Sequence, residues 1–509
     1  MTRAGIARGA SATLVVLIAV AAAAYFLRPA SRPVATTASG ISPSDAPSSR
    51  PPDRPVSGAP QGETAVQWPD AAAEDAQGFL YGRITTVDGA VFEGRLRWGG
   101  VEEAFWDDLF NGTKSNNPWL AMVAPERRPV ESHPLEIFGI KIAQRERPSE
   151  VSRPFLARFG EIARLDARGD EVRVTLRSGS VVDLDRFEAS DFDDDVRVWD
   201  GRRGVVDLDS LRIRTIEFLP TPALGDLPVR LYGKVRTGQG DFTGFIGWNR
   251  EECVGTDELD GDSASGEKRL RFDSIRSIVK LTRDSSEVKL ADGSEIVLTG
   301  NAEVGEDNRG IYIGDRRYGR VLVSWAAFER IDFRPIAART AHGEASDGSE
   351  PGDASDLGDG ANGPAYEDFP PGRPLIGSVT TRDGRRLAGR LVFDLDESET
   401  TDTLDAPSLG VDYTVPFGRI AAIEPITSSA PAAAGSPSGG EERGAPNSVV
   451  SLYGGETLRL ERAGDLGPAN AGMLIFVEGA VTPEYVPWSD VAQIDFERPP
   501  AIHPALNPL

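Results

Sequence analysis

Apolar and polar residues alternate at every second position in many short stretches of this chain, from about residue 80 onward. This period of two is typical of half-buried β-strands, whose side chains point alternately to the core and to solvent. No long segment after Leu27 has the period of an amphipathic helix. The pattern therefore predicts an all-β fold.

One strand-rich stretch occurs three times, at residues 82–109, 233–259 and 377–404. Each copy contains G-x-[IV]-x-T, a turn glycine, a second glycine and [LI]-x-[WF], followed by x3-E-x4-D-x-L with the same spacing. The recurring positions are Trp98, Glu102, Asp107 and Leu109; Trp248, Glu252, Asp257 and Leu259; and Phe393, Glu397, Asp402 and Leu404. This agreement indicates internal duplication, and we term the unit repeat A.

Each repeat A has the features of a β-hairpin. Asp88-Gly89 and Asp383-Gly384 are dipeptides typical of tight turns, in which glycine supplies a positive φ. The second glycine of each copy stands inside a predicted strand and indicates a bulge or a sharp bend; these residues are Gly94, Gly244 and Gly389.

A second unit, repeat B, alternates with repeat A. It opens with V-x-L-x-x-G and closes with I-[DE]-F, and its copies span Val174 to Phe218, Val288 to Phe333 and Val450 to Phe496. A domain of about 60 residues buries little surface on its own, so we expect A and B to pack in pairs. The fold prediction is about six small β-barrels in three A–B pairs, with a six-bladed propeller as the alternative.

Composition predicts the boundaries between these units. Segments rich in Pro, Ser, Ala and Gly cannot bury enough apolar surface to fold and are predicted to be disordered linkers. The predicted order is a transmembrane anchor or signal segment (1–28), a linker (29–77), barrel pair A1–B1 (78–219), barrel pair A2–B2 (228–336), an acidic linker (337–372), barrel A3 (373–426), a linker (427–446), barrel B3 (447–498) and a tail (499–509).

Repeat A resembles the Sm/LSm family of small SH3-like β-barrels over about 50–60 residues per copy. The motif V-x-x-x-D-G-x-x-x-x-G-x-L-x-F-D, from Val379 to Asp394, is similar to the family's first signature. Segments similar to its second signature begin at Phe138, Phe272 and Phe417. In the family an Asn and an Arg-Gly build an RNA-base pocket, but no Asn follows Asp394 and the three Phe stand in place of the Arg. The resemblance therefore implies a barrel fold without RNA binding.

The N-terminus predicts export. Arg3 and Arg8 precede an apolar run at residues 9–27, which is near the length that crosses a bilayer. The small residues Ala21 to Ala24 leave a cleaved signal peptide as the alternative. We expect a single-pass inner-membrane protein with its C-terminal region in the periplasm, or a secreted protein if the segment is cleaved. Low Lys and high Arg, Ala and Gly usage indicates a GC-rich bacterium.

Charge and composition exclude several function classes. The 79 acidic residues exceed the 55 basic ones, and a net charge of −24 repels nucleic acid. A single cysteine, Cys253, and three separated histidines, His133, His342 and His503, do not provide a zinc site or a Ser-His-Asp triad. We predict no catalytic residue, no cofactor and no metal site.

The acidic run at residues 394–405 has three interpretations. Its spacing places oxygen-bearing residues at the ligand positions of an EF-hand loop, but Glu399 stands where that loop needs glycine. A catalytic carboxylate pair is the second interpretation. Since Glu102, Glu252 and Glu397 recur in all copies, we predict a structural role in which each caps a bend or pairs with an arginine of a neighbouring strand.

The aromatic residues divide into two groups. Trp98, Trp248, Trp325 and Trp488 recur at fixed repeat positions, which favours core packing. An insertion found only in A1, at residues 102–123, contains Phe105, Trp106, Phe110 and Trp119. These four are the candidate exposed contact surface, with a cap over barrel A1 as the alternative.

Two functions from different classes agree with these features. The first is a non-enzymatic, membrane-tethered extracytoplasmic scaffold that holds an envelope protein or polymer. The second is a secreted hydrolase or polysaccharide-active protein that uses the repeat carboxylates. An enzyme would concentrate unusual polar residues in one copy of the repeat.

Overall fold

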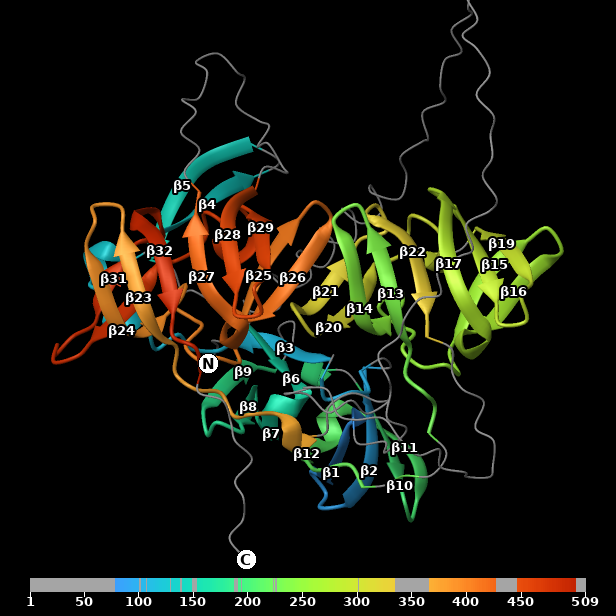
Figure 1. Cartoon of the computed structure of the whole chain (residues 1–509). Helices are drawn as coiled ribbons and strands as arrows, with labels where there is room; N and C mark the ends of the chain where they lie inside the picture. Colours follow the sequence, from blue (N-terminus) through green and yellow to red (C-terminus); the bar gives the residue numbers. More distant parts are fainter. Residues whose placement is uncertain are drawn as a thin grey trace, which may run out of the picture. The chain divides into compact units, whose positions relative to one another are not determined.

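The computed structural model (Figure 1) describes residues 78–334, with short gaps at 100–101, 107, 129, 138–139, 149–152, 187–190, 194, 223, 225–226 and 301, and residues 366–426 and 446–499. All of these lie in one unit of the chain, Gln67–Leu509. The predicted anchor at 9–27, the linkers at 29–77, 337–365 and 427–445, and the tail from residue 500 lie outside the described residues. Within the described part, no helix has the length and apolar character needed to span a membrane.

The prediction of an all-β fold is confirmed. Regular structure in the described residues consists of β-strands and short 3-10 helices. The strands form three large antiparallel sheets and a separate hairpin of β4 (Val130–Ile137) and β5 (Ile140–Pro148). We define three modules, each built from one repeat A and one repeat B: module 1 (78–219), module 2 (227–334) and module 3 (366–426 with 446–499).

The two repeats of module 1 interleave in a single sheet. Repeat A1 supplies β1 (Tyr81–Thr86), β2 (Val91–Trp98), β3 (Leu109–Lys114), β6 (Pro154–Arg158) and β7 (Ile162–Arg168). Repeat B1 supplies β8 (Glu171–Leu176), β9 (Val181–Asp185), β10 (Val196–Asp200), β11 (Gly204–Leu208) and β12 (Ile213–Phe218). The strand order is β11-β10-β2-β1-β12-β7-β8-β9-β3-β6. The 3-10 helices are η2 (Leu120–Met122), η3 (Pro125–Arg127), η4 (Phe159–Glu161), η5 (Asp191–Asp193) and η6 (Ser210–Arg212).

Module 2 repeats this arrangement. Its strands are β13 (Tyr232–Thr237), β14 (Gly240–Gly247), β15 (Glu258–Ser263), β16 (Gly266–Arg271), β17 (Ile275–Thr282), β18 (Ser285–Leu290), β19 (Glu295–Thr299), β20 (Ile311–Asp315), β21 (Gly319–Val323) and β22 (Phe328–Phe333). Its 3-10 helices are η7 (Phe272–Ser274) and η8 (Ala302–Val304). The order β16-β15-β19-β18-β17-β22-β13-β14-β20-β21 continues into β26 and β25 of module 3.

Module 3 is therefore divided between two sheets. Its strands are β23 (Ile376–Thr381), β24 (Arg386–Val392), β25 (Thr403–Ser408), β26 (Val411–Pro416), β27 (Ile420–Pro425), β28 (Pro446–Leu452), β29 (Thr457–Glu461), β30 (Met473–Val477), β31 (Glu484–Val486) and β32 (Val491–Phe496). Its 3-10 helices are η9 (Tyr366–Asp368), η10 (Phe417–Arg419), η11 (Gly464–Leu466) and η12 (Trp488–Asp490). Eight strands form their own sheet in the order β29-β28-β27-β32-β23-β24-β30-β31.

These pairings do not separate repeat A from repeat B. In every module the first two A strands pair with late B strands, as β2 pairs with β10, β14 with β20 and β24 with β30. The sheets are open in their hydrogen-bonding order. The predicted count of six barrels is therefore not confirmed, and the unit that recurs is the interleaved A–B pair.

The second glycine of each repeat A explains why those strands can pair. A Cβ atom added at Gly94, Gly244 or Gly389 would lie 2.0, 2.0 or 2.1 Å from a carbonyl oxygen of the neighbouring repeat B strand. Only glycine permits so close an approach of two backbones. These glycines, predicted to mark a bulge or bend, thus provide the contact between the two repeats.

The pairing register is the same in the three modules. Gly82 pairs with Phe218, Gly233 with Phe333 and Gly377 with Phe496. Each of these strand pairs also has one register shift, at a Thr four residues after the paired glycine: Thr86, Thr237 and Thr381. The backbone therefore repeats even where the side chains differ.

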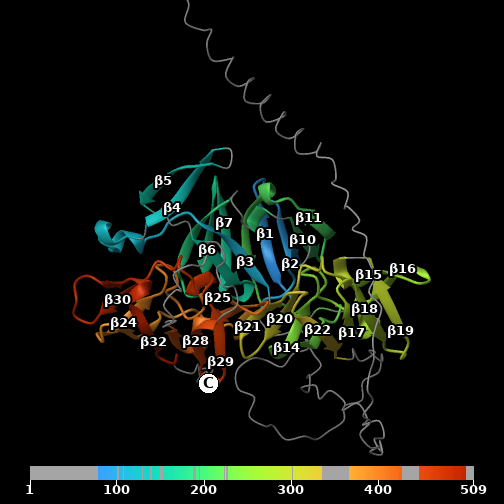
Figure 2. The same ribbon diagram turned by 90° about the horizontal axis from the view of Figure 1, so that it is seen from above.

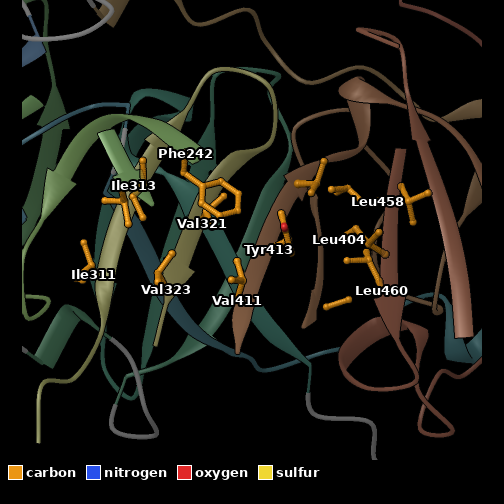
Figure 3. Packing of buried hydrophobic residues seen from close by; sticks show 14 of the residues in the cluster. Phe242, Ile311, Ile313, Val321, Val323, Leu404, Val411, Tyr413, Leu458 and Leu460 are labelled. Carbon is orange, nitrogen blue, oxygen red and sulfur yellow. The ribbon is translucent and has the colours of Figure 1, made fainter. Parts of the chain in front are cut away.

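Modules 2 and 3 share one hydrophobic core (Figure 3). Strands β21 and β26 pair across the junction, with Val321 opposite Tyr413 and Val323 opposite Val411. Figure 3 shows Phe242 and these residues facing Leu404, Leu458 and Leu460 across the same core. The apolar faces of the two modules are thus buried against each other.

Two segments differ from their predicted roles. The predicted linker 337–372 is structured at its end, because Tyr366 and Phe369 are buried in the core of module 1 and the Tyr366 hydroxyl donates to the carbonyl of Ile162 at 2.9 Å. In module 1 the residue equivalent to Phe272 and Phe417 is Phe159, which also opens a 3-10 helix. The predicted equivalent, Phe138, lies outside the described residues, in the short gap between β4 and β5.

Candidate functional site

The acidic run singled out by the sequence belongs to a bend that recurs in every module. After the second strand, two residues adopt left-handed backbone conformations: Asn249 and Arg250 in module 2, and Asp394 and Leu395 in module 3. The chain then returns, so that Trp98 bridges Glu102, Trp248 bridges Glu252 and Phe393 bridges Glu397 through backbone hydrogen bonds. The recurring Glu closes the bend with its backbone.

An aspartate caps each bend with its side chain. In module 2 the Asp257 carboxylate accepts bonds from the backbone N–H groups of Cys253 and Val254, at 2.9 and 3.1 Å. In module 3 the Asp402 carboxylate accepts from Ser398 and Glu399 at 2.7 and 2.9 Å. A carboxylate that receives two backbone N–H groups fixes the turn much as an N-cap fixes a helix.

In module 1 this cap is Asp108. Its carboxylate accepts from the N–H groups of Glu103 and Ala104, at 2.9 and 2.8 Å. Asp107, which the sequence spacing assigned to this position, lies outside the described residues. Module 1 has one more residue between Ala104 and the capping Asp108 than module 2 has between Val254 and Asp257. A motif defined by equal spacing in the sequence does not show this one-residue insertion.

A second acidic residue, from repeat B, lies at each bend. The N–H groups of Asn111, Asp260 and Asp405 donate to the carboxylates of Asp191, Glu303 and Asp465, at 2.7, 2.7 and 2.6 Å. Sequence analysis missed these three residues. In modules 2 and 3 the signal was the acidic residue five positions before an N-x-G turn, whose Asn amide donates to the backbone carbonyl of that same residue.

The recurring aromatic residues hold the bend to the core. Trp98 is buried in the core of module 1, and Trp248 and Trp325 are buried in the core that modules 2 and 3 share. Trp488 is half-buried against that shared core. The indole N–H groups of Trp98 and Trp248 donate to the backbone carbonyls of Asp191 and Glu303, at 2.7 and 3.0 Å. In modules 1 and 2 the tryptophan of repeat A is therefore hydrogen-bonded to the acidic residue of repeat B.

The paired carboxyl groups have unusual acidities. Burial, followed by repulsion from Glu303, raises the pKa of Glu252 to about 8, and burial raises the pKa of Glu303 to about 7. Burial raises the pKa of Glu397 and of Asp465 well above the ordinary range, with nearby carboxylates adding to the effect. One oxygen of Glu252 and one of Glu397, Oε2 in each, is buried and has no hydrogen-bond partner. Their surroundings therefore favour the protonated form of these groups.

The bend of module 3 carries charges that reach module 1. Arg153 donates two bonds to Asp394, at 3.1 and 3.2 Å, and Lys114 lies 2.5 Å from Asp396. The amide of Asn117 donates to the carbonyl of Leu395 at 3.1 Å. We term these contacts the module 1–3 latch.

Comparison with module 2 shows what is special in the latch. Asn249 occupies the position of Asp394, and its side-chain oxygen accepts from the N–H of Arg309 at 3.0 Å, as Asp394 accepts from the N–H of Ala471. A neutral side chain therefore suffices inside the module. The charge of Asp394 serves the contact with Arg153.

The insertion of A1 supports the latch, and its aromatic residues do not form an exposed surface. Phe105, Trp106 and Phe110 are buried, because they pack in the core of module 1 with Tyr366 and Phe369. Trp119 is half-buried and lies edge-on to Phe476 of module 3, with ring centroids 6.1 Å apart. The predicted contact surface is thus a cap and an internal junction.

The carboxylates of residues 394–405 have separate hydrogen-bond and ion-pair partners. Asp394 and Asp396 face basic residues of module 1, Asp402 caps the bend, and Asp405 accepts from the hydroxyls of Thr403 and Thr414. Among the residues that the structure describes, no group of three or more His, Cys, Asp or Glu is placed to hold a metal ion.

A small cavity lies where modules 1 and 2 meet. Its volume is about 40 Å³, and its lining includes Glu102, Asp108, Arg230, Arg250 and Cys253. Such a volume holds on the order of one water molecule. Cys253 is buried there, and burial raises the pKa of its thiol, which makes it a poor nucleophile.

No protein family, curated protein or solved structure gives a significant match to this chain.

Proposed function

We propose that this protein is a non-enzymatic, membrane-tethered extracytoplasmic scaffold that holds an envelope protein or polymer. The observation that carries the proposal is the use made of the recurring acidic residues. Asp108, Asp257 and Asp402 each accept two backbone N–H bonds in the same bend. Carboxylates committed in this way to backbone geometry in three modules act as structural elements.

The unusual polar residues of the chain point the same way. An enzyme would gather them in one copy, facing a cleft. Asp394, an acid at a position where module 2 has Asn249, and the nearby Asp396 instead bind Arg153 and Lys114 of module 1. Together with the shared core of modules 2 and 3, they support a single platform with several exposed sheet edges.

The N-terminal sequence supports the proposed location. Residues 9–27 are apolar and follow Arg3 and Arg8, which favours a cytoplasmic N-terminus and an exported remainder. A linker at 29–77 would then separate the platform from the inner membrane. The modules in this proposal are interleaved derivatives of small SH3-like barrels, and the strongly negative charge disfavours nucleic acid as a partner.

One observation favours a second function, a hydrolase or polysaccharide-active protein. The pKa of Glu252 is raised to about 8 and that of Glu303 to about 7, so each of these carboxyl groups exchanges its proton near neutral pH. Glycosidases use such pairs, one carboxyl as the acid and the other as the base or nucleophile.

A binding experiment distinguishes the two functions. The full chain, solubilised in detergent, is incubated with isolated cell-wall sacculi and, separately, with solubilised envelope proteins. We expect retention of the chain on one of these fractions, equal for the wild type and for the triple variant Glu102→Gln, Glu252→Gln and Glu397→Gln. Release of soluble sugar or peptide fragments by the wild type, lost in Glu252→Gln alone, would establish the hydrolase and refute the scaffold.

The proposed location has its own test. A reporter that works only in the cytoplasm, fused after Leu509, should stay inactive.

A further inference from the structure

The three modules offer equivalent sheet edges that differ in what covers them. Strands β11, β21 and β31 are each the outer partner of the third repeat B strand, with Leu208, Val323 and Val486 paired to Val196, Ile311 and Met473. The three edges therefore have the same place in their modules. Any difference between them reflects their partners.

Edge β21 is covered by a strand of module 3. Strand β26 pairs with it from Arg320 to Val323, and this burial leaves Val321 and Val323 fully inaccessible to solvent. Strand β26 contributes apolar residues at alternate positions, Val411 and Tyr413, and both are buried. Main-chain bonds and alternate apolar side chains together make this joint.

Edge β31 is covered by the last residue of η3 in module 1, Arg127. The guanidinium of Arg127 donates to the outward carbonyl of Tyr485 at 2.9 Å and lies over its ring, 5.1 Å from the centroid. Tyr485 and Val486 are buried. A side chain thus occupies the acceptor that a further strand would use.

Edge β11 is the open member of the set. It ends the sheet of module 1, and among the described residues no strand pairs with its outer side (Figure 2). Val205 is 58% exposed and Gly204 and Asp207 are exposed, while Val206, the equivalent of the fully buried Val321, is only half-buried. Exposed edges of native sheets are normally blunted by charge or covered, because they pair readily with other chains.

We propose that β11 binds an extended segment of another protein by β-strand addition, in the manner in which β21 binds β26. The register of the internal joint places an apolar partner residue opposite Val206 and another opposite Leu208, as Tyr413 and Val411 lie opposite Val321 and Val323. The exposed Asp207 carboxylate already accepts two bonds from Arg197, and a second acid facing it would be unfavourable, so the partner residue opposite Asp207 is neutral. The ligand is therefore a strand with alternate apolar residues and no acid at its centre.

Charge argues against strand β16 of a second copy as this partner. β16 is the equivalent of β26 in module 2, because its pairing with β15 matches that of β26 with β25. In the same register it would place Glu267 opposite Asp207 and Lys268 opposite the apolar Val206. Both pairings are unfavourable, and they leave β16 with the charged sequence typical of a protected edge.

This inference rests on the proposed scaffold function and names one of its binding surfaces. The test uses the full chain and a fluorescent peptide with the sequence of β26 and its flanks, residues 409–418, carrying the single change Asp412→Asn, because Asp412 would otherwise lie opposite Asp207 in this register. We expect saturable binding by anisotropy to the wild type, and at least tenfold weaker binding to Val206→Lys, which puts a charge where the partner packs. Val205→Arg is the matched control, because module 2 has Arg320 at that position, and it should bind like the wild type.

Hydrogen exchange on the wild type locates the bound peptide without using Val206→Lys, so the conclusion does not depend on the folding of that variant. The peptide should slow exchange of the amides of residues 204–208 and leave β16 unchanged. No binding to the wild type, equal binding to Val206→Lys, or protection confined to β21 would overturn the inference. A dimer of the wild type that Val206→Lys converts to a monomer would assign the edge to a second copy instead. If the peptide does not bind β11 but the chain is still retained on envelope fractions, the inference about β11 is wrong and the scaffold function is still supported.

Discussion

Replacement of Glu252 by Gln should make the protein more stable at alkaline pH. Glu252 lies in the bend of module 2 with a buried Oε2 that has no hydrogen-bond partner, and burial, followed by repulsion from Glu303, raises its pKa to about 8. In the unfolded chain the pKa returns to the ordinary value near 4.5. Folding therefore opposes ionisation of this group.

The sign and the size follow from proton linkage. Below pH 4.5 the carboxyl is protonated in both states, and its contribution to stability is fully present. As the pH rises from 4.5 towards 8 the unfolded chain releases this proton while the folded state retains it, so the contribution is lost at about 1.4 kcal/mol per pH unit. The full effect would be about 5 kcal/mol, and partial solvent access reduces it, so we expect about 2–4 kcal/mol.

The assay is urea denaturation followed by tryptophan fluorescence at pH 5, 7 and 9. Glu252→Gln should match the wild type within about 1 kcal/mol at pH 5 and exceed it by about 2–4 kcal/mol at pH 9. Glu251→Gln is the matched control, because Glu251 is an exposed neighbour paired with Arg309 on the surface. An equal pH dependence in Glu252→Gln and the wild type, or the same gain in Glu251→Gln, would refute the reasoning.

Two further predictions concern the latch and the strand contacts. Asp394→Asn should leave module 3 folded, because Asn249 makes the same internal bond in module 2. Asp394→Asn and Arg153→Met should each remove the ion pair of the latch and make the module 1–3 junction more sensitive to trypsin. Unchanged digestion of both variants would contradict the latch. Gly244→Ala should lower stability by more than about 3 kcal/mol, since its Cβ would lie 2.0 Å from a carbonyl oxygen of β20. Gly89→Ala, whose Cβ would meet nothing within 4 Å, should lose only about 1 kcal/mol through its positive φ, and equal losses in thermal melts would count against the close-approach argument.

Much of the local structure of this protein could be read from short stretches of sequence. The period of two predicted strands, and Asp88-Gly89 and Asp383-Gly384 predicted turns whose glycines have φ of +84° and +86°. These features depend on neighbouring residues alone, because the pleat and the turn are properties of a few consecutive dihedral angles. For the same reason the all-β class was predictable.

The site was predictable only in part. Glu252 and Glu397 were found because they recur, but their partners Glu303 and Asp465 lie more than 50 residues away in repeat B. The capping role in module 1 was assigned to Asp107 because letter spacing ignores a one-residue insertion, whereas the backbone bonds identify Asp108. Geometry, and not spacing, decides which side chain reaches a given N–H.

The sequence by itself determined the strands, the turns and the threefold repetition of units A and B, since each follows from residues close together in the chain. Only the tertiary structure decided that A and B interleave, that Phe105, Trp106 and Phe110 are buried, and that Asp394 meets Arg153. Those outcomes depend on which strand edges and apolar faces meet after folding. Many pairings satisfy the same alternating pattern, and packing at residues such as Gly94 selects among them.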